Sequence, residues 1–306
     1  MLHIETFDPH EPFYTLQRYK DLYPHEYDGP LFDWPPYARV TEPRNMVEHC
    51  RLEYAALLTM CDTHLGMVLD AMDRLGMWDD TMLIVNTDHG FLLGEHDYWA
   101  KCHVPFFNEV AHTPLFIWDP RSGVAAERRD ALVQTVDLAP TVLEYFGIDC
   151  TPDMQGVPLK DTIAGDLPVR QAGLYGIHGG HVNCTDGRYV YMRGCANSDN
   201  EPLCNYTLMP THMRGFFDHE ELAEMELAEP FTFTKGLRTM RTPGRRSRNL
   251  HEFGTMLFDL QEDPGQERPL DDPEVEEMMI DHLIREMRAN DAPIEQYARL
   301  GLEDRV

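Results

Sequence analysis

Four residues carry functional groups that could bind a metal ion and stabilise an oxyanion. Asp88 and His89 directly follow the apolar run 81–86, and they pair a hard oxygen ligand with an imidazole. Lys101 comes shortly afterwards, and an ammonium beside a metal ion can neutralise a tetrahedral oxyanion. His10 stands between two prolines, which restrict its backbone, so that its imidazole can act as a donor or general acid at neutral pH. Together these residues predict a metal-assisted site for an anion.

Three further histidines are candidates for contacts with a substrate. His103 lies two positions after Lys101 and is expected at the rim of the same site. His178 and His181 flank a Gly-Gly pair, for which two interpretations stay open. The imidazoles could reach a sugar or a metal, or they could face solvent at the approach to a hairpin.

The first half of the chain has the pattern of alternating helices and strands. Apolar residues recur at intervals of three and four from Asn45 to Leu75, which predicts a long amphipathic helix ending at Gly76. A second helix is predicted over 137–146. Three short apolar runs, typical of buried parallel strands, accompany them: 81–86, 114–118 and 132–136. We therefore expect an α/β fold with a mainly parallel sheet, in which ligands gather at the carboxyl ends of the strands.

The second half has a different, antiparallel character. Residues 182–185 and 188–192 flank Asp186-Gly187, which predicts a hairpin with a tight turn. A strand over 256–260 and a helix opened by Asp272-Pro273 follow. We expect a domain over 1–165 that forms an α/β core, and a smaller antiparallel subdomain with a C-terminal helix over 166–306. A basic cluster is either a solvated loop or a contact for an anionic substrate: Arg241, Arg245, Arg246 and Arg248.

Composition excludes several classes of protein. The 306 residues carry a net charge of −27, which argues against a nucleic-acid binder because such proteins need a basic surface. No apolar run approaches the roughly 20 residues that span a bilayer, and the first residues do not resemble a signal peptide. The seven cysteines form no Cys-x-x-Cys pair, which favours reduced thiols. We expect a cytoplasmic protein with no nucleic-acid or membrane partner.

The motifs occur together in one known family. The stretch from Val85-Asn86-Thr87-Asp88-His89-Gly90 to Lys101 resembles the sulfatase family of the alkaline phosphatase superfamily. Pro9-His10-Glu11-Pro12-Phe13 resembles the histidine segment of that family. Further similar segments follow in the right order: 113–117, 136–156 and 257–264.

The resemblance implies an alkaline-phosphatase-like α/β/α core and metal-assisted hydrolysis of a small anionic sulfate monoester or sulfamate. It implies that Asp88 and His89 are metal ligands, that Lys101 holds the sulfate, and that His10 contacts it or helps the leaving oxygen depart. The metal would be calcium, as in most sulfatases. A histidine at position 89 also resembles phosphonate monoester and phosphodiester hydrolases, which use manganese or zinc, so a phosphate ester is the alternative substrate.

The sequence departs from the family pattern at the nucleophile. Sulfatases have a strand ending in paired aspartates, and a Cys-x-Pro-Ser-Arg motif whose cysteine becomes formylglycine. Cys150-Thr151-Pro152 continues with Asp153 and Met154 and lies after Asp88, so we interpret Cys150 as a loop cysteine. We expect the chain to match the carboxyl-terminal part of a sulfatase, to bind metal weakly and not to turn over a sulfate ester alone. The alternative is a truncated, non-catalytic remnant that binds anions or a partner chain. An exposed sheet edge would favour self-association.

Overall fold

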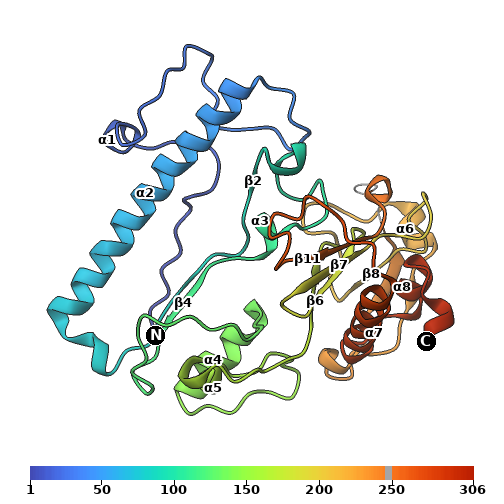
Figure 1. Ribbon diagram of the computed structural model, residues 1–306. Helices are drawn as coiled ribbons and strands as arrows, with labels where there is room; N and C mark the ends of the chain where they lie inside the picture. Colours follow the sequence, from blue (N-terminus) through green and yellow to red (C-terminus); the bar gives the residue numbers. More distant parts are fainter. Residues whose placement is uncertain (245–249) are drawn as a thin grey trace. The chain divides into compact units, whose positions relative to one another are not determined.

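The computed structural model describes residues 1–244 and 250–306, and the chain divides into two compact units (Figure 1). Unit 1 comprises Met1–His103 and Glu109–Ala125, and unit 2 comprises Val104–Asn108 and Ala126–Val306. Three arginines of the predicted basic cluster, Arg245, Arg246 and Arg248, lie outside the described residues. The boundary expected between residues 165 and 166 stays a prediction. None of the described helices has the length and apolarity needed to cross a bilayer.

Unit 1 is organised around one long helix. The predicted helix is confirmed as α2, which runs from Arg44 to Leu75 and ends at Gly76 in the left-handed conformation, with a φ of 64°. Its Cys50 and Leu57 pack with Phe13 and Trp99 in a buried cluster. The other elements of unit 1 are short: α1 (Gln17–Lys20), β1 (Leu83–Asn86), β2 (Leu92–Leu93), β3 (Trp99–Ala100), α3 (Asn108–Ala111, whose first residue belongs to unit 2) and β4 (Leu115–Trp118).

Replacing glycine by alanine should have opposite effects on stability at the end of α2 and inside it. Gly76→Ala should lower the free energy of unfolding of unit 1 by about 1–2 kcal/mol, because an L-residue is strained at positive φ. Gly66→Ala, inside α2 and with open space around a new Cβ, should raise it by up to about 1 kcal/mol.

Urea unfolding followed by tryptophan fluorescence would measure both changes, because all four tryptophans belong to unit 1: Trp34, Trp78, Trp99 and Trp118. A Gly76→Ala variant as stable as the parent chain would contradict the assignment of this helix end.

The strands of unit 1 correct one sequence prediction. Two predicted strands form as β1 and β4, but they pair antiparallel, with Leu83 opposite Trp118 and Asn86 opposite Leu115. All strand pairs in the described part of the chain are antiparallel, so the expectation of mainly parallel pairing is wrong there. An apolar run indicates a strand and not its direction. A parallel pair would need a crossover of a dozen or more residues, usually a helix, whereas the only α-helix between β1 and β4 is the single turn α3.

A second correction concerns the apolar run 132–136. No strand forms there. Thr135–Asp137 instead make a 3-10 turn that leads into α4 (Leu138–Tyr145), and Val136 is exposed while Asp137 is fully buried. The predicted helix over 137–146 is therefore confirmed, and the predicted strand before it is wrong.

Unit 2 contains a four-stranded antiparallel sheet in the order β11-β7-β6-β5. The predicted hairpin is confirmed as β6 (Val182–Thr185) and β7 (Tyr189–Arg193), but β7 begins one residue later than predicted, so Asp186, Gly187 and Arg188 connect the two strands. The other described helices and strands are α5 (Lys160–Gly165), β5 (Gly173–Gly176), β8 (Cys204–Thr207), α6 (His219–Ala223), β9 (Glu226–Leu227), β10 (Met240–Pro243), β11 (Met256–Asp259), α7 (Pro273–Ala289) and α8 (Ile294–Arg299).

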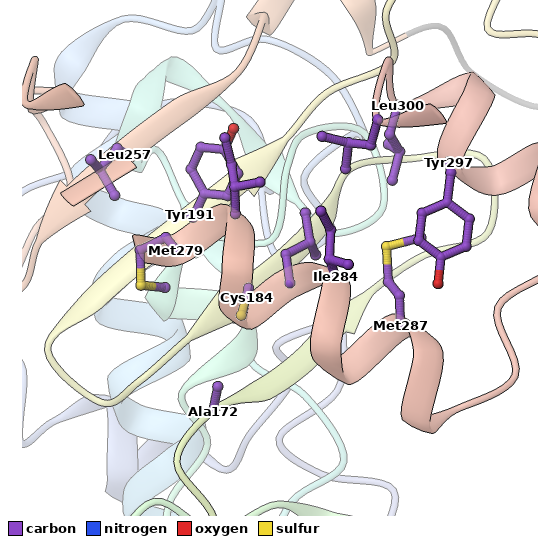
Figure 2. Close-up of a cluster of buried hydrophobic side chains, with 12 residues drawn as sticks. Ala172, Cys184, Tyr191, Leu257, Met279, Ile284, Met287, Tyr297 and Leu300 are labelled. Atoms are coloured by element: carbon purple, nitrogen blue, oxygen red, sulfur yellow. The ribbon is translucent and has the colours of Figure 1, made fainter. Parts of the chain in front are cut away.

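Helix α7 covers one face of this sheet. It begins as predicted, because Asp272 accepts hydrogen bonds from the backbone of Glu274 and Val275, and proline occupies the first turn. Its apolar side chains interdigitate with those of the sheet, as Figure 2 shows. The fully or nearly fully buried members include Cys184, Tyr191, Leu257, Met279, Leu283 and Leu300. This core accounts for the predicted antiparallel subdomain with a C-terminal helix.

Candidate functional site

Asp88 and His89 lie in unit 1, at the carboxyl end of β1. The His89 amide donates to Asp88 Oδ1 over 2.9 Å, and His89 Nε2 lies 3.5 Å from Asp88 Oδ2. The Asp88 side chain is 83% exposed. Position 90 requires glycine, because a Cβ there would lie 1.8 Å from the carbonyl oxygen of Glu109. The backbone thus fits closely at Gly90, while the two candidate ligands face open space.

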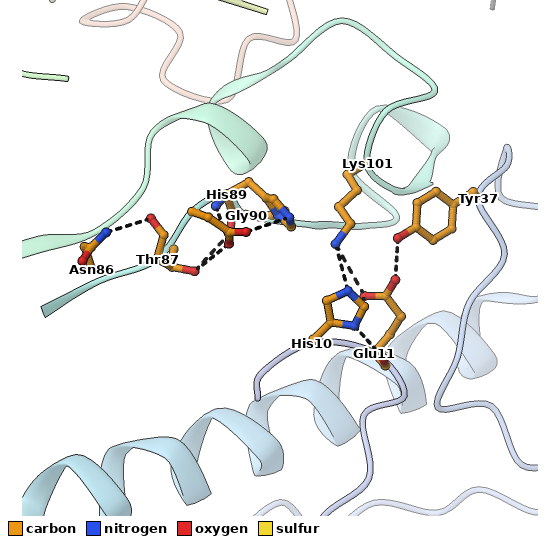
Figure 3. A network of polar contacts seen from close by, with 9 residues as sticks. His10, Glu11, Tyr37, Asn86, Thr87, His89, Gly90 and Lys101 are labelled. Atoms are coloured by element: carbon orange, nitrogen blue, oxygen red, sulfur yellow. Dashed lines mark hydrogen bonds and ion pairs between the residues drawn. The ribbon is translucent and has the colours of Figure 1, made fainter. Parts of the chain in front are cut away.

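Lys101 and His10 meet although they lie far apart in the sequence. Lys101 Nζ lies 3.3 Å from His10 Nε2 and 4.0 Å from Glu11 Oε2. Tyr37 donates from its hydroxyl to Glu11 Oε1 over 2.5 Å. Lys101 is 9% exposed and Glu11 only 3%, whereas the His10 side chain is 39% exposed, so this network (Figure 3) is nearly buried at Lys101 and Glu11 and open to solvent at His10. The structure therefore brings together the ammonium and the imidazole that the sequence singled out.

The hydrogen bonds of His10 fix which of its nitrogens faces Lys101. His10 Nδ1 lies 2.6 Å from the backbone carbonyl oxygen of Glu11. A carbonyl can only accept, so Nδ1 carries the proton of the neutral imidazole. Nε2 then offers its lone pair to the Lys101 ammonium. The Glu11 carboxylate lies 3.3 Å from Nδ1, where it would stabilise the imidazolium.

Glu11 and Tyr37 are residues that the sequence reasoning missed. A signal for Glu11 was available, because an acidic residue inside the Pro-His-Glu-Pro motif sits next to the candidate histidine. No local pattern marks Tyr37, which reaches Glu11 only through the fold.

The three remaining histidines are placed differently. The ring of His103 lies 5.7 Å from that of Tyr37, so it neighbours the Lys101 network. His178 and His181 belong to unit 2 and contact carbonyl oxygens there, His178 that of Cys204 and His181 that of Gly254. His181 is buried, and this burial lowers its pKa.

The two contact networks of unit 1 are separate. Asp88 accepts from the amide of His89, and His89 Nδ1 lies 3.0 Å from the carbonyl oxygen of Gly90. In Figure 3 no dashed line joins His89 to Lys101 or His10. No group of three or more His, Cys, Asp or Glu converges in the described residues. Calcium takes six to eight oxygen ligands. Asp88 and His89 therefore match part of a donor set in kind but do not form a complete metal site, and we derive no chemical step through a metal.

Two family models match overlapping parts of this chain. The model of the sulfatase family covers residues 1–148, and that of the N-sulphoglucosamine sulphohydrolase C-terminal region covers 94–226. Together the two models match residues 1–226, and this part of the chain belongs to the sulfatase family. The matched residues include all four members of the candidate site, and they include every segment that suggested this family in the sequence except 257–264.

The chain is also similar in sequence to individual sulfatases. The chain is 32% identical to N-acetylglucosamine-6-O-sulfatase of Bacteroides thetaiotaomicron over 40% of its length and 22% of the relative. It is 29% identical to choline-sulfatase of Rhizobium meliloti over 51% of its length and 34% of the relative. The chain thus spans well under half of these curated relatives.

A solved structure shows the same fold. A protein crystallised with its substrate D-glucosamine-2-N,6-O-disulfate superposes with a TM-score of 0.56 and 17% identity, over 80% of this chain and 42% of that one. The predicted alkaline-phosphatase-like α/β fold is confirmed, with the correction to strand direction given above.

Proposed function

We propose that this sulfatase chain supplies the anion-binding residues of a sulfuric ester hydrolase, with a sulfate monoester or sulfamate as substrate. The observation that carries the proposal is the convergence of the nearly buried Lys101 ammonium on the His10 imidazole at 3.3 Å. A fixed positive charge in a shielded site stabilises negative charge that develops on a transferring sulfuryl group. Membership of the sulfatase family supports the same chemistry.

The residues would divide the work as follows. Lys101 binds the sulfuryl oxygens through its ammonium. His10 would act as the imidazolium and donate its second proton, at Nε2, to the leaving oxygen, while Nδ1 stays committed to the Glu11 carbonyl. Glu11 is a positioning residue, whose carboxylate lies near both cations and is itself held by Tyr37. His103 would line the rim. The substrate contacts predicted for His178 and His181, which belong to unit 2, stay a prediction.

We also propose that Asp88 and His89 contribute two ligands to a divalent cation, calcium in the first place and manganese or zinc as alternatives. The support is their position at the end of β1, their exposed donor atoms and the resemblance to the family motif. Water or other donors would have to complete the coordination.

A parallel activity panel tests the proposed function. The protein expressed from its whole reading frame and the 306-residue chain would both be assayed with an aryl sulfate, an aryl phosphodiester and an aryl phosphonate monoester. We expect the reading-frame product to prefer the sulfate ester by at least about tenfold in kcat/KM, roughly 1.4 kcal/mol of transition-state binding.

The 306-residue chain should not exceed the blank with any substrate, because its sequence contains no Cys-x-Pro-Ser-Arg motif. Faster hydrolysis of the phosphodiester or phosphonate would contradict the sulfatase assignment. Absence of any turnover by the reading-frame product would favour a protein that only binds anions.

A further inference from the structure

Two histidines outside the candidate site converge in unit 1. His25 lies in the irregular segment between α1 and α2, and His49 lies near the start of α2. Their nitrogens, His25 Nε2 and His49 Nδ1, are 2.7 Å apart. Neutral imidazole is the commonest metal ligand in proteins, so this pair is a candidate site for a transition-metal ion.

Both rings are held in this orientation by other contacts. His25 Nδ1 lies 2.8 Å from the carbonyl oxygen of Tyr23, so this nitrogen carries the proton and Nε2 has the free lone pair. Histidines that bind metals usually donate their second nitrogen to such a carbonyl or to a carboxylate. The ring of Tyr27 stacks on His49 with 3.9 Å between centroids and 10° between planes.

In the metal-free chain the 2.7 Å separation is that of an N–H···N hydrogen bond, which His49 Nδ1 donates to His25 Nε2. A metal ion would take the place of the shared proton. Imidazole nitrogens suit Cu²⁺ and Ni²⁺, and affinity among the divalent first-row metals is highest for Cu²⁺.

We propose that His25 and His49 together bind a Cu²⁺ or Ni²⁺ ion and thereby fasten the segment around His25 to α2. Within the described residues no third His, Cys, Asp or Glu joins them, so water completes the coordination. On binding, the proton of His49 moves from Nδ1 to Nε2 by exchange with solvent, and the net charge of the ring does not change.

Calorimetric titration of the whole chain with NiCl₂ tests this site. The chain has 15 histidines, so weak background binding is expected and matched variants are needed. His25→Ala and His49→Ala should each weaken the strongest nickel site at least tenfold. His64→Ala removes an exposed histidine from the same helix and should leave that site unchanged. Asp88→Asn should also leave it unchanged, which separates it from the proposed site at Asp88 and His89.

Two further measurements test the metal site if an alanine variant folds poorly. His25→Asn retains an acceptor for the His49 proton but removes the imidazole, and it should also lose the nickel site. The electron paramagnetic resonance spectrum of the chain with one equivalent of Cu²⁺ should show coupling to two nitrogens, reduced to one in His25→Asn. Equal nickel affinity in the parent chain, His25→Asn and His49→Ala would overturn the proposal and assign the binding to background histidines.

Discussion

Replacing Lys101 with methionine is expected to weaken the binding of inorganic sulfate to this chain by about 10- to 100-fold. Lys101 is nearly buried and its ammonium lies beside His10, so no other cation in that network can take its place directly. A hydrogen bond to a charged group contributes about 1.5–3 kcal/mol, and about 1.4 kcal/mol corresponds to tenfold in affinity. Methionine keeps most of the length of the side chain and removes the charge.

Matched variants separate the local effect from the change in net charge. Lys160→Met removes the same charge from a half-exposed lysine of unit 2 and should leave sulfate binding unchanged within about twofold. Lys101→Arg keeps the cation and should recover most of the affinity. Circular dichroism would check that Lys101→Met still folds, because Glu11 then lacks one neighbouring cation. Equal sulfate affinity in Lys101→Met and the parent chain would refute the anion site.

Replacing Arg170 with leucine is expected to lower the free energy of unfolding of unit 2 by about 3–5 kcal/mol. Asp137 is fully buried, and both of its carboxylate oxygens accept hydrogen bonds from Arg170. The same carboxylate accepts from the amides of Gln134 and Val157, so it joins three segments of the chain. Removing one partner of a buried ion pair leaves an uncompensated charge, which is strongly destabilising.

The measurement has to report on unit 2, because every tryptophan belongs to unit 1. Amide hydrogen exchange on peptides from β6 and β7, at increasing urea concentrations, would give the free energy of unfolding of that sheet. The double variant Asp137→Asn/Arg170→Leu should be more stable than Arg170→Leu alone, because the buried charge is gone. Arg285→Leu, which breaks a half-exposed pair on α7, should change stability by less than about 1 kcal/mol. A similarly small effect for Arg170→Leu would contradict this account of Asp137.

Local signals in the sequence predicted much of the fold. The end of α2 at Gly76, the turn at Asp186-Gly187 and the start of α7 at Asp272 follow from rules that depend on a few neighbouring residues. The direction of β1 and β4 could not be predicted in this way, because an apolar run carries no information about its partner. The run 132–136 was misread as a strand for the same reason, since its apolar residues occur where the chain turns into α4.

In the candidate site, too, features set by neighbouring residues could be predicted from the sequence, and contacts between distant residues could not. Asp88 and His89 are adjacent in sequence, and their position after a strand was predictable. The contact between Lys101 and His10 joins residues 91 positions apart, and only the resemblance to a family suggested it. The role of Tyr37 needed the folded chain, because its hydroxyl reaches Glu11 from a separate segment.

The central claim is that Lys101 and His10 bind the sulfuryl group, and a crystal structure of the chain soaked with selenate tests it most directly. Selenate has the charge and shape of sulfate, and its selenium can be located by anomalous scattering. The account predicts the strongest anomalous peak where selenate oxygens lie within about 3 Å of Lys101 Nζ and His10 Nε2. A strongest peak elsewhere, for example beside Arg238 and Arg241 in unit 2, with none at Lys101, would contradict it.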